Sequence, residues 1–181
     1  MQKVLVPLAE GFEEIEAVTI IDVLRRAEMH VVIAALAGDL VIGAHGIAIQ
    51  ADRLLDGIDE DEFAAIVLPG GMPGSRHLIE HDGLLRILRQ MNEKKKWIGA
   101  ICAAPTVIKA AGIIEGRQMT SYPAYENDLE EAVYCQDSVV VDENLVTSRG
   151  PGTALIFSLQ MVSLLAGEEK AAELTKAMLV V

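Results

Sequence analysis

Short apolar runs alternate with amphipathic segments along most of the chain. A continuous apolar run is typical of a buried strand, whereas apolar residues three and four positions apart are typical of a helix. The sequence therefore predicts strands at residues 3–8, 30–36, 63–68 and 97–101, a hairpin at 41–50 and a strand pair at 139–148. It predicts helices at residues 14–26, 78–92 (with a break near residues 82–83), 103–111, 153–166 and 168–179.

The first predicted helix shows the clearest periodicity. Its apolar positions repeat with the spacing of one helix face, and acidic residues precede the helix while two arginines close it, as the helix dipole favours. The apolar residues are Ala17, Ile20, Ile21, Leu24 and Ala27.

Apolar strands that alternate with helices predict an α/β fold, a mostly parallel sheet with helices on both faces. No linker, repeat or low-complexity segment interrupts the pattern, so we expect one domain over residues 1–181. In such folds the functional groups follow the carboxyl ends of the strands.

Composition narrows the range of partners. The chain has 27 acidic and 15 basic residues and a net charge of −12, which argues against a nucleic-acid partner. No apolar run is long enough for a membrane helix, and the early Glu10, Glu13 and Glu14 are unlike a secretory leader. We therefore expect a soluble, cytoplasmic protein that binds neither nucleic acid nor membrane.

Cys102 directly follows a predicted strand and precedes a predicted helix. The flanking Ala100 and Ala104 give it the pattern of a nucleophile elbow, a tight turn whose neighbours must be small. The amides of the following helix would stabilise a thiolate there, and Pro105 is tolerated in its first turn. A free cysteine is ordinarily a small buried apolar residue, but this context favours a reactive thiol.

Gly70 and Gly71 follow the neighbouring strand at 63–68. Paired glycines let two backbone amides point to one place, as in an oxyanion hole, although the same sequence also suits a sharp turn. The segment is not a phosphate loop, because it lacks the required Lys and Ser/Thr.

Acidic residues follow the first strand. Glu13 and Glu14 are interpreted as a solvated helix start, whereas Glu16 precedes Ile20 by four residues and borders the apolar face. A carboxyl group in such a place can remain protonated and can move a proton.

The remaining side chains that could bind a metal ion form no recognisable site in the sequence. His77 and His81 are four residues apart and could share a helix face, but no third zinc ligand follows. No histidine is an evident base for Cys102, and Cys135 is interpreted as structural. We expect no metal and no cofactor.

Five motifs together resemble the ThiJ/PfpI superfamily, in the branch of the Parkinsonism-associated deglycase, over nearly the whole chain. The motifs are residues 10–16 (EGFEEIE), 22–27 (DVLRRA), 68–71 (LPGG), 100–105 (AICAAP) and 147–153 (TSRGPGT).

The resemblance implies a flavodoxin-like three-layer sandwich and a homodimer with the first helix at its interface. It implies that Cys102 is the reactive thiol, that Glu16 is the carboxylic acid hydrogen-bonded to it, and that no cofactor takes part. It also implies that the amides of Gly71 and Ala103 hold an oxyanion and that Gly70 belongs to the same pocket. The segment with Arg149, Gly150 and Pro151 is expected to lie close to this pocket.

This sequence departs from the family at one position. Many relatives have a histidine before Pro123, where this chain has Tyr122, and a phenol is a poor base at neutral pH. The protease branch carries a histidine directly after its cysteine, where this chain has Ala103.

Two hypotheses follow from the resemblance. The first is a cofactor-independent glyoxalase or deglycase that acts on methylglyoxal or its adducts through Cys102. The second is an oxidative-stress sensor or chaperone-like protein whose Cys102 is oxidised to sulfinic acid without turnover. The partner is accordingly a small reactive carbonyl or an oxidant.

Overall fold

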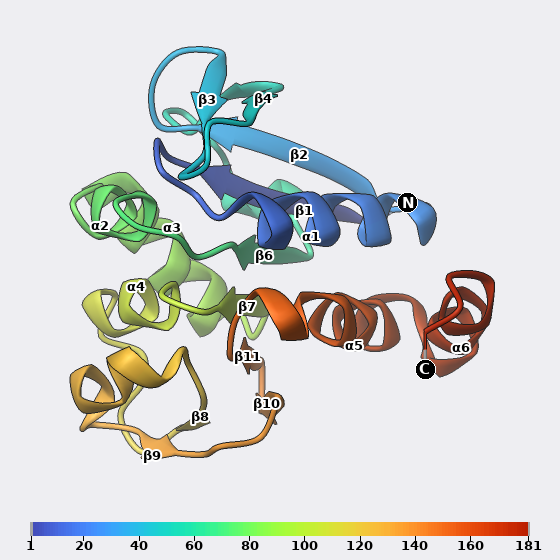
Figure 1. Cartoon of the computed structure of the whole chain (residues 1–181). Coiled ribbons are helices and arrows are strands. Elements are labelled where there is room, and N and C mark those ends of the chain that lie inside the picture. The colour runs from blue at the N-terminus through green and yellow to red at the C-terminus, as the bar shows by residue number, and fades with distance from the viewer. Residues whose placement is uncertain (1, 181) are drawn as a thin grey trace.

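The computed structural model of the protein describes residues 2–180 and is built around a seven-stranded sheet (Figure 1). Neighbouring strands are parallel except for the first pair in the sheet order, which is antiparallel. In sheet order the strands are β10 (Val139–Asp142), β11 (Leu145–Ser148), β7 (Trp97–Ile101), β6 (Ala65–Leu68), β1 (Lys3–Leu8), β2 (His30–Ala35) and β5 (Arg53–Leu54).

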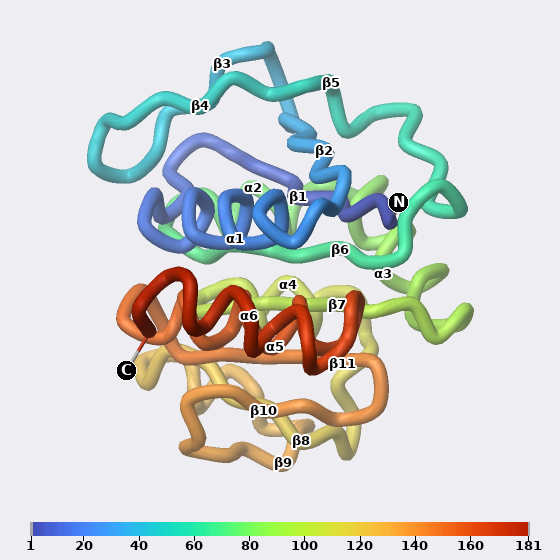
Figure 2. The backbone as a smooth tube through the Cα atoms, turned by 90° about the vertical axis from the view of Figure 1, so that its right-hand side faces the viewer, coloured from blue at the N-terminus to red at the C-terminus, as the bar shows by residue number. Residues whose placement is uncertain are grey.

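Two small strand pairs stand apart from the main sheet. The first is the antiparallel hairpin of β3 (Leu40–Ile42) and β4 (Ala48–Gln50), and the second joins β8 (Gln118–Met119) to β9 (Val133–Tyr134). Figures 1 and 2 both show these pairs at opposite ends of the molecule.

Helices cover both faces of the sheet. They are α1 (Glu14–Arg26), α2 (Gly74–Ile79), α3 (Asp82–Glu93), α4 (Pro105–Ala110), α5 (Ala154–Ala166) and α6 (Glu168–Ala177), with 3-10 turns η1 (Glu60–Glu62), η2 (Pro123–Leu129) and η3 (Pro151–Thr153). None of the helices in residues 2–180 has both the length and the apolar character that a membrane crossing requires.

The core lies in two layers, one on each side of the sheet. Alternate residues of β1 enter different layers: Val4 and Val6 pack in the layer of α1 and α5, and Leu5 packs in the layer of α3 and α4. This is the period-two alternation that a strand covered on both faces requires. The predicted α/β architecture, with its flavodoxin-like arrangement, is therefore confirmed.

One predicted helix was placed wrongly. The sequence predicted a helix from residue 78 with a break near 82–83, whereas α2 already begins at Gly74 and the break lies at residues 80–81. The break has a local cause, because the His81 Nδ1 accepts the Leu84 N–H at 3.0 Å and caps the start of α3.

The parallel register brings the carboxyl ends of β11, β7, β6, β1, β2 and β5 to one edge of the sheet. In this register Leu68 of β6 faces Ala100 of β7, and Ile101 of β7 faces Ser148 of β11. Residues that follow these strands are therefore neighbours in space, as the fold class predicts for a functional site.

Candidate functional site

Cys102 occupies a strained turn between β7 and α4. Its φ is +63°, in the left-handed region that non-glycine residues rarely adopt. Its N–H donates to the Ser148 carbonyl at 3.0 Å, and its carbonyl accepts the Tyr122 N–H at 2.9 Å. The turn is therefore clamped by the ends of two other segments, which is how a strained conformation persists at a functional site.

The glycine pair after β6 packs directly against this turn. A Cβ atom on Gly70 would lie 2.7 Å from the Cys102 Cβ and 2.9 Å from the Ala103 nitrogen, so only glycine fits there. Gly71 has a φ of +96°, which glycine adopts without strain. The backbone N–H groups of Gly71 and Ala103 both reach the Cys102 sulfur and lower its pKa.

Glu16 lies beneath the thiol, in the first turn of α1. Its side chain is fully buried, and its Oε2 accepts the Gly70 N–H at 2.8 Å. Its Oε1 has no hydrogen-bond partner of good geometry among residues 2–180, although Cys102 is close enough to lower the pKa of the carboxyl. Burial outweighs these contacts and raises the Glu16 pKa to about 7, so this carboxyl exchanges its proton near neutral pH.

The surroundings of Cys102 do not give its thiol a low pKa. Burial raises its pKa to about 12, and the negative charge of Glu16 acts in the same direction, against the two amides. The expected amides are present, since the N–H groups of Ala103 and Gly71 lower the Cys102 pKa, but burial and the Glu16 charge raise it by more. Protonation of Glu16 removes the opposing charge and therefore lowers the pKa of the Cys102 thiol.

A cavity of about 220 Å³ opens onto the thiol. Its volume suits a small molecule of a few heavy atoms. Tyr122 and Tyr125 line it, with ring centroids 6.4 Å apart. The other lining residues are Glu13, Gly71, Met72, Cys102, Ala103 and Pro151.

The remaining residues predicted for the site lie at its margin. Arg149 and Gly150 line an adjoining cavity that shares Tyr122 and Pro151 with the thiol cavity. The Arg149 guanidinium donates to the Gln136 carbonyl at 3.0 Å, so it is engaged away from the thiol.

Two glutamates interpreted as solvated have other roles, and that interpretation is wrong. Glu13 lines the thiol cavity, and Glu14 is only 4% exposed. Glu14 accepts the His45 N–H at 2.5 Å and contacts the His45 Nδ1 at 2.8 Å, which ties the β3–β4 turn to α1. The helical spacing carried no signal for this burial, because the covering residues are about thirty positions away in sequence.

Histidines and acidic residues give no evident metal centre at the thiol. His77 lies in α2 and His81 in the following break, so they do not share a helix face. Within residues 2–180, His45 with Glu13 and Glu14 forms one group of possible ligands, and Asp59–Asp61 forms another. His45 pairs with Glu14, Lys94 with Glu60 and Lys96 with Asp61, and the Asp59 carboxylate accepts the Asp61 N–H.

Comparison with known proteins gives a family match over most of the chain. The model of the DJ-1/PfpI family matches residues 2–164. The protein dj-1beta of Drosophila melanogaster is 42% identical over 179 residues, covering 97% of this chain and 96% of that protein. The Caenorhabditis elegans protein named glutathione-independent glyoxalase DJR-1.2 is 37% identical, covering 92% and 90%.

Some relatives are much longer than this chain. Protein DJ-1 homolog B of Arabidopsis thaliana is 42% identical over 98% of this chain. The match covers only 41% of that protein and 46% of Arabidopsis homolog A, so the chain spans less than half of these relatives.

Solved structures agree with the sequence matches. The crystal structure of Drosophila DJ-1beta has a TM-score of 0.96 and 42% identity, covering 99% of this chain and 98% of that one. The structure of oxidised Toxoplasma gondii DJ-1 has a TM-score of 0.94 and 35% identity, with coverage of 99% and 98%.

Proposed function

The chain belongs to the DJ-1/PfpI family, and we propose that it is a cofactor-independent glyoxalase or deglycase with Cys102 as its nucleophile. The observation that carries the proposal is one arrangement: a thiol in a strained turn, two backbone N–H groups at its sulfur, and a buried carboxyl beside it. A relative named as a glutathione-independent glyoxalase supports the same reaction class. Such a thiol must stay reduced, so the proposal places the protein in the cytoplasm.

The proposed reaction converts methylglyoxal and water to lactate. The Cys102 sulfur adds to the aldehyde carbon, and a C–S bond forms while the carbonyl π-electrons move to oxygen. The amides of Gly71 and Ala103 hold this oxyanion until it takes a proton. Glu16 then removes the hydrogen of that carbon as a proton, which gives an enediol, and returns a proton to the neighbouring carbon. The hydroxyl proton of the first carbon passes to the oxygen of the second, which leaves a lactoyl thioester. Water hydrolyses the thioester and restores the thiol, so the aldehyde carbon is oxidised and the ketone carbon is reduced.

The direct test is lactate formation from methylglyoxal by the purified protein. Lactate must be measured rather than loss of methylglyoxal, because arginine and lysine side chains also consume this reagent. We expect saturable formation of one lactate enantiomer, since a chiral pocket delivers the proton to one face. No lactate above the protein-free background contradicts the proposal.

A second candidate function is oxidant sensing at Cys102. It is favoured by the two N–H groups at the sulfur, which would equally hold the oxygens of a sulfinate. The solved Toxoplasma relative, described as oxidised, supports the same candidate function.

Peroxide treatment tests this second function. With about two equivalents of peroxide per protein, one for each oxygen added, we expect a mass gain of two oxygen atoms confined to the peptide of Cys102, while Cys135 stays reduced. Equal oxidation of both cysteines, or of neither, contradicts a dedicated sensor site. Lactate formation without selective oxidation leaves only the enzymatic function.

We also propose that the protein forms a homodimer through α1. Ile15 and Val18 are 59% and 48% exposed, and their spacing places them on one face of that helix. Ile156 of α5, which packs against α1, is also exposed at 42%. Such an apolar surface on the helix that carries Glu16 suits burial against a second copy.

Val18→Glu is expected to convert the dimer to a monomer, because it puts a charge into the proposed interface. Sedimentation equilibrium of both proteins measures this. Val133→Glu, which adds the same charge at an exposed valine of β9 outside α1, serves as the control and is expected to leave a dimer. A monomeric wild-type protein at micromolar concentration contradicts the proposal.

A further inference from the structure

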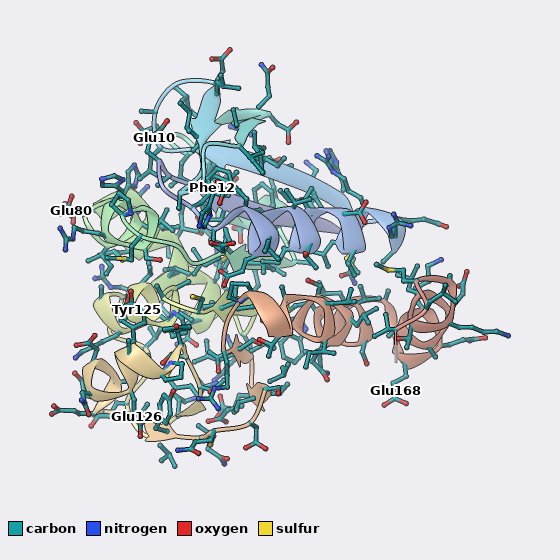
Figure 3. The ribbon with its side chains drawn as sticks, in the orientation of Figure 1. Glu10, Phe12, Glu80, Tyr125, Glu126 and Glu168 are labelled. Carbon is teal, nitrogen blue, oxygen red and sulfur yellow. The ribbon has the colours of Figure 1, made fainter. Side chains whose placement is uncertain are left out.

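A larger cavity of about 390 Å³ adjoins the thiol cavity, and we call it the α2–α4 groove. Met72 and Tyr125 line both cavities, so the two cavities are direct neighbours. Figure 3 shows Tyr125 on the side of the molecule where Figure 1 places α2 and α4. The other lining residues are Arg76, Ile79, Thr106, Lys109 and Asp128.

The groove carries two positive charges in a chain with a net charge of −12. The Arg76 guanidinium makes no hydrogen bond or ion pair with any residue of 2–180. The half-buried Lys109 donates to the backbone carbonyl of Asp128 at 2.6 Å and forms no ion pair with a carboxylate in the described chain. Neither charge is therefore neutralised by a side chain.

Hydrogen-bonding capacity in the groove is also largely uncommitted. The ammonium of Lys109 retains two further N–H donors, and the hydroxyl of Tyr125 has no partner in residues 2–180. Asp128 is the one acidic side chain among the lining residues, against two basic ones. Two cations and a phenol at one groove suit a carboxylate or another oxyanion.

We propose that the α2–α4 groove binds an anionic group of the substrate while Cys102 reacts with a carbonyl several atoms away. This inference rests on the proposed function, because it names a substrate class for the same thiol. A groove of this kind favours carbonyl compounds or adducts that carry a remote carboxylate over neutral compounds of equal length. The apolar side chains of Met72 and Ile79 suit the chain that joins the two ends.

The test compares two thiol reagents that differ only in their terminal group. Maleimidohexanoic acid carries a carboxylate, and maleimidohexanamide is its neutral counterpart. The rate of Cys102 modification by each is followed by intact mass in a Cys135→Ser background. The ratio of the two rates is compared with the same ratio for 2-mercaptoethanol, which has no groove.

We expect the wild-type ratio to exceed that of 2-mercaptoethanol, although the overall negative charge of the protein repels the acid. Arg76→Gln and Lys109→Gln are each expected to lower the ratio about two- to fivefold, the range for a partly exposed charge pair. Near-molar salt is expected to lower it as well, by screening.

Two further variants test whether the ratio depends on the charge within the groove or on the net charge of the protein. Lys109→Arg keeps the positive charge and is expected to keep the ratio. Lys176→Gln removes one positive charge from exposed α6, which Figure 1 shows far from α2 and α4, and is expected to leave the ratio unchanged. A wild-type ratio at or below that of 2-mercaptoethanol overturns the proposal, and so does a ratio unaffected by both groove substitutions.

The readout does not require turnover. A protein that forms no lactate but prefers the carboxylate reagent contradicts the glyoxalase proposal and supports the anion groove. A protein that forms lactate but shows no preference supports the enzyme and overturns the groove. The failures of the two proposals are therefore distinguishable.

Discussion

Replacement of Cys102 by alanine is expected to abolish lactate formation from methylglyoxal. The thiol forms the covalent bond to the aldehyde carbon, and none of the other residues that line its cavity offers a second thiol. Loss of a covalent nucleophile removes the whole reaction path, so the rate should fall by at least about 10³-fold. The measurement is enzymatic quantification of D- and L-lactate.

Cys135→Ser is the matched control for this substitution. Cys135 is the only other cysteine, and its Sγ contacts Gln118 in the small sheet of β8 and β9, away from the cavity residues. We expect this variant to retain the wild-type rate. Equal lactate formation by Cys102→Ala and wild type rules out Cys102 as the nucleophile.

The sequence correctly predicts elements whose ends are set by interactions between residues close in sequence. Helix α1 was predicted at 14–26 and is observed at Glu14–Arg26, because its apolar periodicity and its terminal charges agree. The strand predicted at 63–68 begins only at Ala65, since the Phe63 N–H closes η1 by donating to the Glu60 carbonyl. Phe63 is apolar because it is buried in the core, not because it belongs to a strand.

Helix α2 shows why some elements could not be predicted. Its first residue, Gly74, donates its N–H to the Gly11 carbonyl at 3.3 Å, and a Cβ there would lie 2.8 Å from the Phe12 nitrogen. The helix is thus positioned by a loop sixty residues earlier in sequence. No periodic apolar pattern marks a helix of this length.

The candidate site likewise contains residues that the local sequence locates and residues that only the folded chain brings into place. Cys102 has a local sequence signature, and the spacing of Glu16 to Ile20 places its carboxyl beside the apolar face. The positions of Glu13 and Glu14 depend instead on the β3–β4 turn and on the Gly71 loop, which approach α1 only in the folded chain. The two cations of the α2–α4 groove come from different helices for the same reason.

Glu16→Gln is expected to decrease activity and increase stability. The amide cannot carry the proton between the two substrate carbons, so lactate formation should fall by about 10²- to 10⁴-fold. The amide oxygen can still accept the Gly70 N–H, and the neutral side chain no longer places a charge in the core. A loss of activity through misfolding would instead lower stability.

The pH dependence of stability gives the sharper test. Burial raises the Glu16 pKa from 4.5 to about 7, so the folded protein holds a proton that the unfolded chain releases above about pH 4.5. The stability of the wild type therefore falls as pH rises from 4.5 through 7, by up to roughly 3 kcal/mol for this group. Glu16→Gln lacks this decrease, so its free energy of unfolding should exceed that of wild type at about pH 8 and approach it below about pH 4.5.

Urea denaturation at several pH values measures this difference directly. Glu168→Gln removes an equal charge from the exposed start of α6, which Figure 3 shows far from Phe12, and should follow the wild-type pH profile. A variant at Glu16 that is inactive but shows the wild-type pH profile would mean that the carboxyl is ionised at no net cost in the folded protein. In that case the Glu16 pKa would lie near its ordinary value, which contradicts a carboxyl that exchanges its proton near neutral pH.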